Sequence, residues 1–340
     1  MTEKTQDLSR REFIRQVGLG AAALAAASTV PLELSIASTI KNGMGYRTLG
    51  RTGLEISEVG LGAGSISPSG SNLIRAALSQ GINFIETSSN YKNAQAETAI
   101  GQVVKGMGIR DRVFILSKSG NLEIGRLLKA PASEVEKAVR EELEGSLKRL
   151  QTDYVDLYIS PYMTNSPAEA TLPALQEALE KLKKEGKIRF TGLSTHFDYA
   201  NICMAAINGG YYDVIMFPIN IATLVPRIRN AVLESKKAGE SGKAPGMYER
   251  PIIDVREILK AAQQKNVGVI GIKGAQEGFL PPGLHDRIKG EFAKDTKLSF
   301  HQFAYRFVLD QPQVTSVSIR MANMLHLNEG LVLSQKTLQG

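Results

Sequence analysis

The feature that most constrains the fold is an alternation of short apolar runs with longer amphipathic segments, which starts at residue 46. The apolar runs have the length of buried strands, and segments between them, such as residues 132–150 and 172–185, have helical spacing. Eight strands are predicted, at residues 59–61, 84–86, 113–117, 155–159, 190–194, 214–217, 267–272 and 315–319. Eight strands that alternate with helices predict an α/β fold, a (β/α)₈ TIM barrel of parallel strands.

An N-terminal hairpin is predicted ahead of this barrel, over residues 47–56, because Gly50 and Gly53 mark a turn between two extended runs. The alternative fold is an open doubly wound sheet, which is typically marked by Gly-x-Gly-x-x-Gly after the first strand. The glycines of residues 60–64 form too short a signal for it. The barrel is therefore the favoured architecture.

A long polar loop is predicted at about residues 221–252, between the sixth and seventh strands. It is either a lid over the site or a partly disordered insertion, because it leaves the carboxyl end of a strand, where barrel enzymes bind their substrates. Met247, Tyr248 and Arg250 are its candidate ligand-facing residues.

The first 40 residues carry a different signal. Arg10 and Arg11 stand in Ser-Arg-Arg-Glu-Phe-Ile, and an apolar stretch follows at residues 17–27. This order is typical of a twin-arginine signal, so residues 1–40 are predicted to be signal peptide and linker, with the barrel at residues 44–340. We expect the twin-arginine machinery to export the folded protein to the periplasm or beyond, with no stable membrane insertion after cleavage.

Composition excludes several kinds of site. The net charge of +7 comes from scattered lysines and arginines without interleaved aromatic residues, which argues against a nucleic-acid partner. Cys203 is the single cysteine, so an intramolecular disulfide framework is excluded. The four histidines show no metal-site spacing, and no metal is expected.

A tyrosine and a lysine are the strongest candidates for chemistry. Glu86 and Lys118 each close a predicted strand, and Tyr91 follows Glu86 in the next loop, so all three are expected at one rim of the barrel. An ammonium group beside a phenol lowers the phenol pKa from about 10, which makes a better proton donor. The pair predicts chemistry on a carbonyl group.

Four strings make the chain, from residue 46 to about residue 329, resemble the aldo-keto reductase family. They are Tyr-Arg-Thr-Leu-Gly-Arg-Thr-Gly-Leu at 46–54, Gly-Ile-Asn-Phe-Ile-Glu-Thr at 81–87, Asp-Tyr-Val-Asp-Leu-Tyr at 153–158 and Gly-Lys-Ile-Arg-Phe-Thr-Gly-Leu-Ser at 186–194. The resemblance implies a barrel that holds a nicotinamide dinucleotide without a Rossmann domain. It also implies hydride transfer to an aldehyde or ketone.

The resemblance assigns Tyr91 as proton donor and Lys118 as the residue that tunes it. Two positions of the family's Asp-Tyr-Lys-His set differ here, because Glu86 replaces the aspartate and Pro161 stands where the family has histidine. Proline has no donor, so His196, at the end of the fifth strand, is our candidate for orienting the carbonyl. A structural role for His196 is the alternative.

The resemblance also implies a cofactor site, with NADP favoured and NAD as the alternative. Thr195 stands where the family usually has asparagine, and Lys273 has a charge suited to a pyrophosphate. Arg320 is the candidate for the adenosine phosphate, because a guanidinium binds phosphate with paired donors. The complete set of candidate cofactor residues is Gly62, Ser194, Thr195, Asn220, Lys273, Ser318, Arg320 and Asn328.

The function implied is an exported NAD(P)-dependent oxidoreductase that acts on a small carbonyl or alcohol substrate, which includes sugar-like compounds. Two alternatives stay open. One is a non-redox acid/base enzyme, an eliminase or isomerase that uses Tyr91, Lys118 and His196. The other is a non-catalytic binding protein on the same scaffold.

Overall fold

The computed structural model describes residues 38–237, 253–275 and 297–334, together with residues 286, 288 and 290. Its strands form a closed parallel barrel in the order β10-β11-β4-β5-β6-β7-β8-β9. The barrel strands are β4 (Val59–Gly62), β5 (Phe84–Glu86), β6 (Phe114–Lys118), β7 (Val155–Ile159), β8 (Ile188–Ser194), β9 (Val214–Pro218), β10 (Gly268–Ile272) and β11 (Ser316–Arg320). Each of the eight predicted strands overlaps one of them, so the (β/α)₈ prediction is confirmed.

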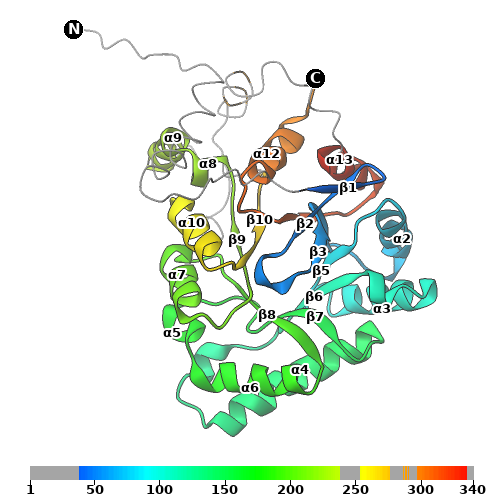
Figure 1. Ribbon diagram of the computed structural model, residues 1–340, viewed down its shortest axis with the longest axis vertical. Coiled ribbons are helices and arrows are strands. Elements are labelled where there is room, and N and C mark those ends of the chain that lie inside the picture. The colour runs from blue at the N-terminus through cyan, green and yellow to red at the C-terminus, as the bar shows by residue number, and fades with distance from the viewer. Residues whose placement is uncertain are drawn as a thin grey trace, which may run out of the picture.

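Helices surround the strands as a ring that follows the chain from α2 to α13 (Figure 1). The predicted helix at residues 132–150 matches α4, and the one at 172–185 corresponds to α6. The helices are α2 (Ser71–Ser79), α3 (Gln95–Met107), α4 (Ala132–Leu150), α5 (Pro167–Ala170), α6 (Pro173–Lys184), α7 (Tyr199–Gly209), α8 (Ile221–Leu224), α9 (Pro226–Lys237), α10 (Arg256–Gln264), α12 (Phe300–Leu309) and α13 (Met324–Ser334).

A small antiparallel sheet closes the amino end of the barrel. It contains β1 (Thr39–Lys41), β2 (Met44–Thr48) and β3 (Glu55–Ser57), and the β2–β3 pair confirms the predicted hairpin. Its turn lies against β10, because a Cβ atom on Gly50 would come within 2.3 Å of the Gly268 backbone nitrogen. Only glycine fits this close approach, and its φ of +48° lies in the left-handed region that favours glycine.

Alternation along the strands decides which side chains reach the interior. Phe84 and Leu116 belong to the cluster inside the barrel, whereas Ile85 and Ile115 pack in the outer cluster that includes helix residues. Since successive side chains of a strand point to opposite faces, Glu86 and Lys118 point inward, two residues after Phe84 and Leu116. Both lie at the carboxyl end of the barrel.

Two predicted boundaries need correction. Residues 221–237 form α8 and α9, not part of a long loop, because Asn220 caps α8 by accepting hydrogen bonds from the backbone of Ala222 and Thr223. The rest of that predicted loop, residues 238–252, lies outside the described residues. Strand β1 begins at Thr39, inside the segment predicted as linker, and the twin-arginine motif also lies outside the described residues.

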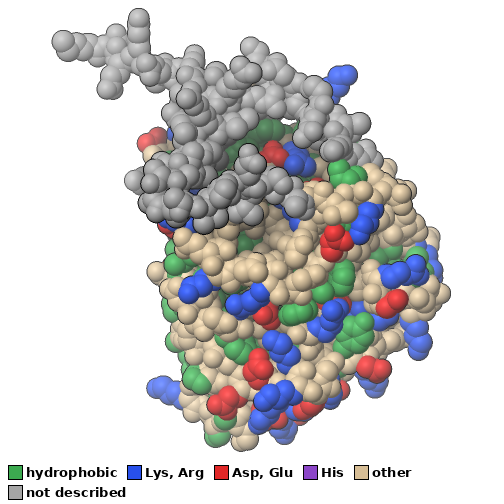
Figure 2. Space-filling view, in the orientation of Figure 1, with side chains coloured by type: hydrophobic (Ala, Val, Ile, Leu, Met, Phe, Trp, Pro, Cys, Tyr) green, Lys and Arg blue, Asp and Glu red, His purple; other side chains and the backbone are tan. Residues whose placement is uncertain are grey.

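No helix in the described part of the chain is long and apolar enough to span a membrane. The same residues contain no cluster of three His, Cys, Asp or Glu side chains that could hold a metal ion. On the face in Figure 2, lysine and arginine side chains are interspersed with aspartate and glutamate, and they form no continuous basic stripe there.

Candidate active site

Glu86, Tyr91 and Lys118 form one hydrogen-bonded cluster at the carboxyl end of the barrel. Lys118 Nζ donates to Tyr91 Oη at 3.0 Å and also donates to Glu86 Oε1. Tyr91 Oη donates to the same Glu86 oxygen at 2.9 Å. Glu86 and Lys118 are 5% and 4% exposed, so their charges compensate each other inside the protein.

Neighbouring strands bring these groups together. Strands β5 and β6 pair in parallel, with Glu86 opposite Leu116, and the chain after β5 stays attached to β6. The backbone N–H of Thr87 donates to Leu116 O at 2.8 Å, and that of Ser89 donates to Lys118 O at 3.1 Å. The loop that carries Tyr91 is thereby held over the end of β6.

A left-handed segment follows Tyr91. Lys92, Asn93 and Ala94 have φ values of 51°, 54° and 67°, which non-glycine residues adopt rarely. The chain reverses there and enters α3 directly. This strain is tolerated where the surrounding structure holds it, and it positions Tyr91 between the strand end and the helix.

Glutamate at position 86 makes a contact network through both carboxylate oxygens. Oε1 accepts from Lys118 and Tyr91, and Oε2 accepts from Ser318 Oγ at 3.1 Å, on β11, which only β4 separates from β5. The hydroxyl of Ser318 thus supports the carboxylate, and its contact with a cofactor stays a prediction. The longer arm of glutamate therefore contacts the phenol as well as the ammonium.

The pKa of Tyr91 is raised above its ordinary value of about 10. Burial is the largest cause, because it disfavours the charged phenolate, and the carboxylate of Glu86 and the neighbouring Tyr162 add to it. The sequence analysis predicted a lowered Tyr91 pKa, on the basis of the Lys118 ammonium group alone. That prediction is wrong for this arrangement, because it considered neither burial nor a carboxylate in contact with the phenol.

Tyr162 is a member of the site that the sequence analysis missed. Its ring meets the ring of Tyr91 edge-on, with centroids 6.0 Å apart, and Lys118 Nζ lies 4.8 Å from its centroid. The signal was present in the sequence, since an aromatic residue directly follows Pro161 at the end of a predicted strand.

His196 lies two residues beyond the end of β8 and is partly buried. In the barrel order, β6 and β7 separate β8 from β5, which carries Glu86. His196 thus lies at the same end of the barrel as the cluster but is not adjacent to Glu86. Its role in orienting the carbonyl stays a prediction. Pro161, just past β7, is buried.

Three of the predicted cofactor residues are buried at this rim. Ser194 is 2% exposed and ends β8, and the Thr195 hydroxyl is bonded to the backbone of Phe197. Asn220 is fully buried, and its Nδ2 has no hydrogen-bond partner among the described residues. A buried unpaired donor costs about 1–3 kcal/mol, so Asn220 Nδ2 is suited to a polar ligand.

The other predicted cofactor residues lie around the same end of the barrel. Lys273 follows β10, Arg320 ends β11 and donates to Ser65 Oγ, and Asn328 is exposed on α13. Close packing explains the glycine at position 62, because a Cβ atom there would lie 2.9 Å from Ser318 Oγ. Their contact with a cofactor is still a prediction.

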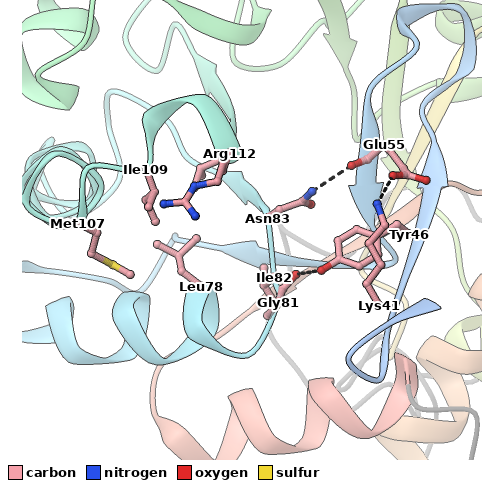
Figure 3. Close-up of a pocket in the computed structure, with 11 residues that line it drawn as sticks. Lys41, Tyr46, Glu55, Leu78, Gly81, Ile82, Asn83, Met107, Ile109 and Arg112 are labelled. Atoms are coloured by element: carbon pink, nitrogen blue, oxygen red, sulfur yellow. Dashed lines mark hydrogen bonds and ion pairs between the residues drawn. The ribbon is translucent and has the colours of Figure 1, made fainter. Parts of the chain in front are cut away.

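A groove of about 670 Å³ lies at the other end of the barrel (Figure 3). Asn83 and Val113, which precede β5 and β6, line it together with Tyr46 of the hairpin. Tyr46 Oη donates to Gly81 O at 2.7 Å, one of the contacts drawn in Figure 3. The groove is therefore separate from the Glu86, Tyr91 and Lys118 cluster.

The chain is similar to known proteins over much of the barrel. The model of the Aldo/keto reductase family matches residues 58–241. Aldo-keto reductase YhdN of Bacillus subtilis (strain 168) is 36% identical over 161 residues, which cover 44% of this chain and 47% of YhdN. L-galactose dehydrogenase of Arabidopsis thaliana is 31% identical over 216 residues, which cover 58% and 64%. The chain thus matches less than two thirds of the length of either relative.

A solved structure shares the fold. It is an aldo-keto reductase from Klebsiella pneumoniae in complex with NADPH, with a TM-score of 0.59 and 23% sequence identity. The match covers 87% of this chain and 90% of that one.

Proposed function

Because the chain belongs to the aldo/keto reductase family, we propose that it transfers a hydride between a nicotinamide cofactor and an aldehyde or ketone. Tyr91 is the proposed proton donor to the carbonyl oxygen. The observation that carries this role is the hydroxyl of Tyr91, held by Lys118 and Glu86 at the carboxyl end of the barrel. Active sites of such barrels are built at that end.

Each side chain of the cluster has a part in the proton transfer. Lys118 Nζ, 3.0 Å from Tyr91 Oη, faces the oxygen on which negative charge develops when the phenol gives up its proton. Glu86 fixes the ammonium group, and Ser318 fixes Glu86 through its second oxygen. The donor is therefore oriented before a substrate arrives.

NADP is the proposed cofactor, with NAD as the alternative. The bound cofactor would supply the hydride. The unpaired Nδ2 of Asn220 and the guanidinium of Arg320 support a polar, anionic ligand at this rim, and the Klebsiella pneumoniae neighbour is an NADPH complex. Arg320 favours the extra phosphate of NADP, because guanidinium groups bind phosphate through paired hydrogen bonds.

A sugar-like carbonyl or alcohol is the proposed substrate class, supported by the similarity to L-galactose dehydrogenase. The test uses folded protein with NADPH or NADH and a panel of aldoses, ketoses and simple aldehydes. Oxidation of the reduced cofactor, followed by its near-ultraviolet absorbance, is expected only when a carbonyl compound is present. Cofactor binding without oxidation would favour a binding protein, and conversion of a sugar without cofactor would favour an isomerase or eliminase.

The rate of carbonyl reduction is expected to show no fall between about pH 6 and pH 10 from ionisation of Tyr91. The protonated phenol is the form that donates, and a pKa raised above the ordinary value of about 10 keeps it protonated across this range. The reverse oxidation needs the phenolate and should be slow near neutrality and rise with pH. Initial rates in both directions against pH test this expectation.

Glu86→Asp is the matched variant for that pH profile. It keeps the charge beside Lys118 but shortens the arm that reaches Tyr91 Oη, so the Tyr91 pKa should fall and the rise in oxidation should begin at lower pH. If the wild-type reduction rate already falls as the pH is raised towards about 9, with cofactor and protein stable, a raised Tyr91 pKa is contradicted.

Export by the twin-arginine route to the periplasm or beyond is a further part of the proposal. It rests on Arg10, Arg11 and the apolar stretch at residues 17–27. Cell fractionation of the wild type and of a variant with both arginines replaced by lysine tests it. Equal export of the two would remove the support for this route.

A further inference from the structure

The cluster of Glu86, Tyr91 and Lys118 contains no second side chain to orient the carbonyl, and His196, the candidate from the sequence, lies further along the rim, after β8. A carbonyl oxygen that gains negative charge is stabilised by more than one hydrogen-bond donor. In this chain the family's histidine position is Pro161, whose side chain has no donor. The second donor must come from another residue at the rim.

Tyr162 is held beside the proton donor by backbone contacts on two sides. Its N–H donates to Ser119 O at 3.1 Å, directly after the end of β6. Two residues later, the N–H of Thr164 donates to Ser194 O at 2.8 Å, at the end of β8. The start of the loop after β7 is thus fixed between the ends of both neighbouring strands.

The ammonium group of Lys118 lies close to the rings of both Tyr91 and Tyr162. Lys118 Nζ lies 5.1 Å from the centroid of Tyr91 and 4.8 Å from that of Tyr162, and the two rings meet at 83°. The Tyr162 side chain is half-buried, and it is one of the groups that raise the pKa of Tyr91. The second phenol therefore interacts electrostatically with the first.

We propose that the Tyr162 hydroxyl is the second hydrogen-bond donor to the substrate carbonyl oxygen, in place of the histidine absent at Pro161; this inference rests on the function proposed above. Tyr162 follows β7, the strand adjacent to the one that carries Lys118, whereas His196 follows β8, one strand further. Tyr162 also contacts both members of the proton-donating pair directly.

The test is Tyr162→Phe, which keeps the ring against Tyr91 and Lys118 and removes only the hydroxyl. Loss of one donor to a developing oxyanion lowers kcat by about 100-fold or more, and that is the expected result here. The dissociation constant for NADPH should be unchanged. The primary isotope effect with NADPH deuterated at the transferred position should rise, because hydride transfer becomes more rate-limiting.

Two companion variants separate catalysis from packing. Tyr162→His restores a donor and should recover part of the lost rate, whereas a purely structural ring would gain nothing from it. Tyr154→Phe removes a phenol whose ring stacks on Arg110 before β7, at the other end of the strand, and should leave kcat unchanged.

Wild-type kcat and isotope effect in Tyr162→Phe, in a protein that reduces carbonyls, would overturn the role of Tyr162 and leave the proposed function standing. A higher KM at constant kcat would also overturn it, since that pattern indicates a binding contact. If the wild type oxidises NADPH with none of the carbonyl compounds tested, the proposed function fails and the inference fails with it.

Discussion

Replacing Tyr91 with phenylalanine is expected to lower kcat for carbonyl reduction by about 10²–10⁴-fold, the range that general acid catalysis contributes. The variant removes the one hydroxyl that Lys118 and Glu86 jointly orient, while its ring can keep the edge-on contact with Tyr162. NADPH binding should stay within about twofold of wild type, because the substitution removes no group from the predicted cofactor set. Steady-state kinetics and a fluorescence titration with NADPH measure the two effects separately.

Tyr46→Phe is the matched control. It also deletes a phenol hydroxyl with a defined hydrogen bond, to Gly81 O, but at the amino end of the barrel beside the groove of Figure 3. It should reduce the free energy of unfolding by about 1 kcal/mol and leave kcat unaltered. A Tyr91→Phe protein that retains wild-type turnover would show that the proton comes from another group.

The barrel was predictable because its signals are local. Apolar runs such as residues 155–159 need burial on both faces, and the glycines of the hairpin mark a turn, so strand positions follow from short stretches of sequence. The convergence of Glu86 and Lys118 was predictable for the same reason, since both close a strand and parallel strands end at one rim.

The electrostatics of the site could not be predicted in this way. The direction of the Tyr91 pKa depends on how deeply the ring is buried and on which atom of Glu86 approaches it, and both are set by packing between distant segments. Likewise, Ser318 contacts Glu86 from a strand 232 positions later in the chain. Helix α9 replaced a predicted loop because its polar composition suits an exposed helix as well as a loop.

Replacing Lys118 with methionine is expected to lower the free energy of unfolding by about 3–5 kcal/mol, the usual cost of removing one partner from a buried ion pair. Glu86 would keep hydrogen bonds only from the neutral hydroxyls of Tyr91 and Ser318, inside a site where it is 5% exposed. Urea unfolding of the folded barrel measures the change. Turnover should be lost as well, because Lys118 also orients Tyr91 Oη.

The double variant Lys118→Met with Glu86→Gln tests whether the lost stability comes from the unpaired charge of Glu86. Without a charge at position 86 no carboxylate is left unpaired, so most of the lost stability should return, although turnover should not. Lys41→Met is the surface control, since Lys41 and Glu55 also form a 2.7 Å ion pair but are 58% and 41% exposed, and it should leave the free energy of unfolding nearly unchanged. If the single and double variants at the site were equally unstable, the loss would come from the packing of the Lys118 chain, and the buried charge pair would not be what stabilises this rim of the barrel.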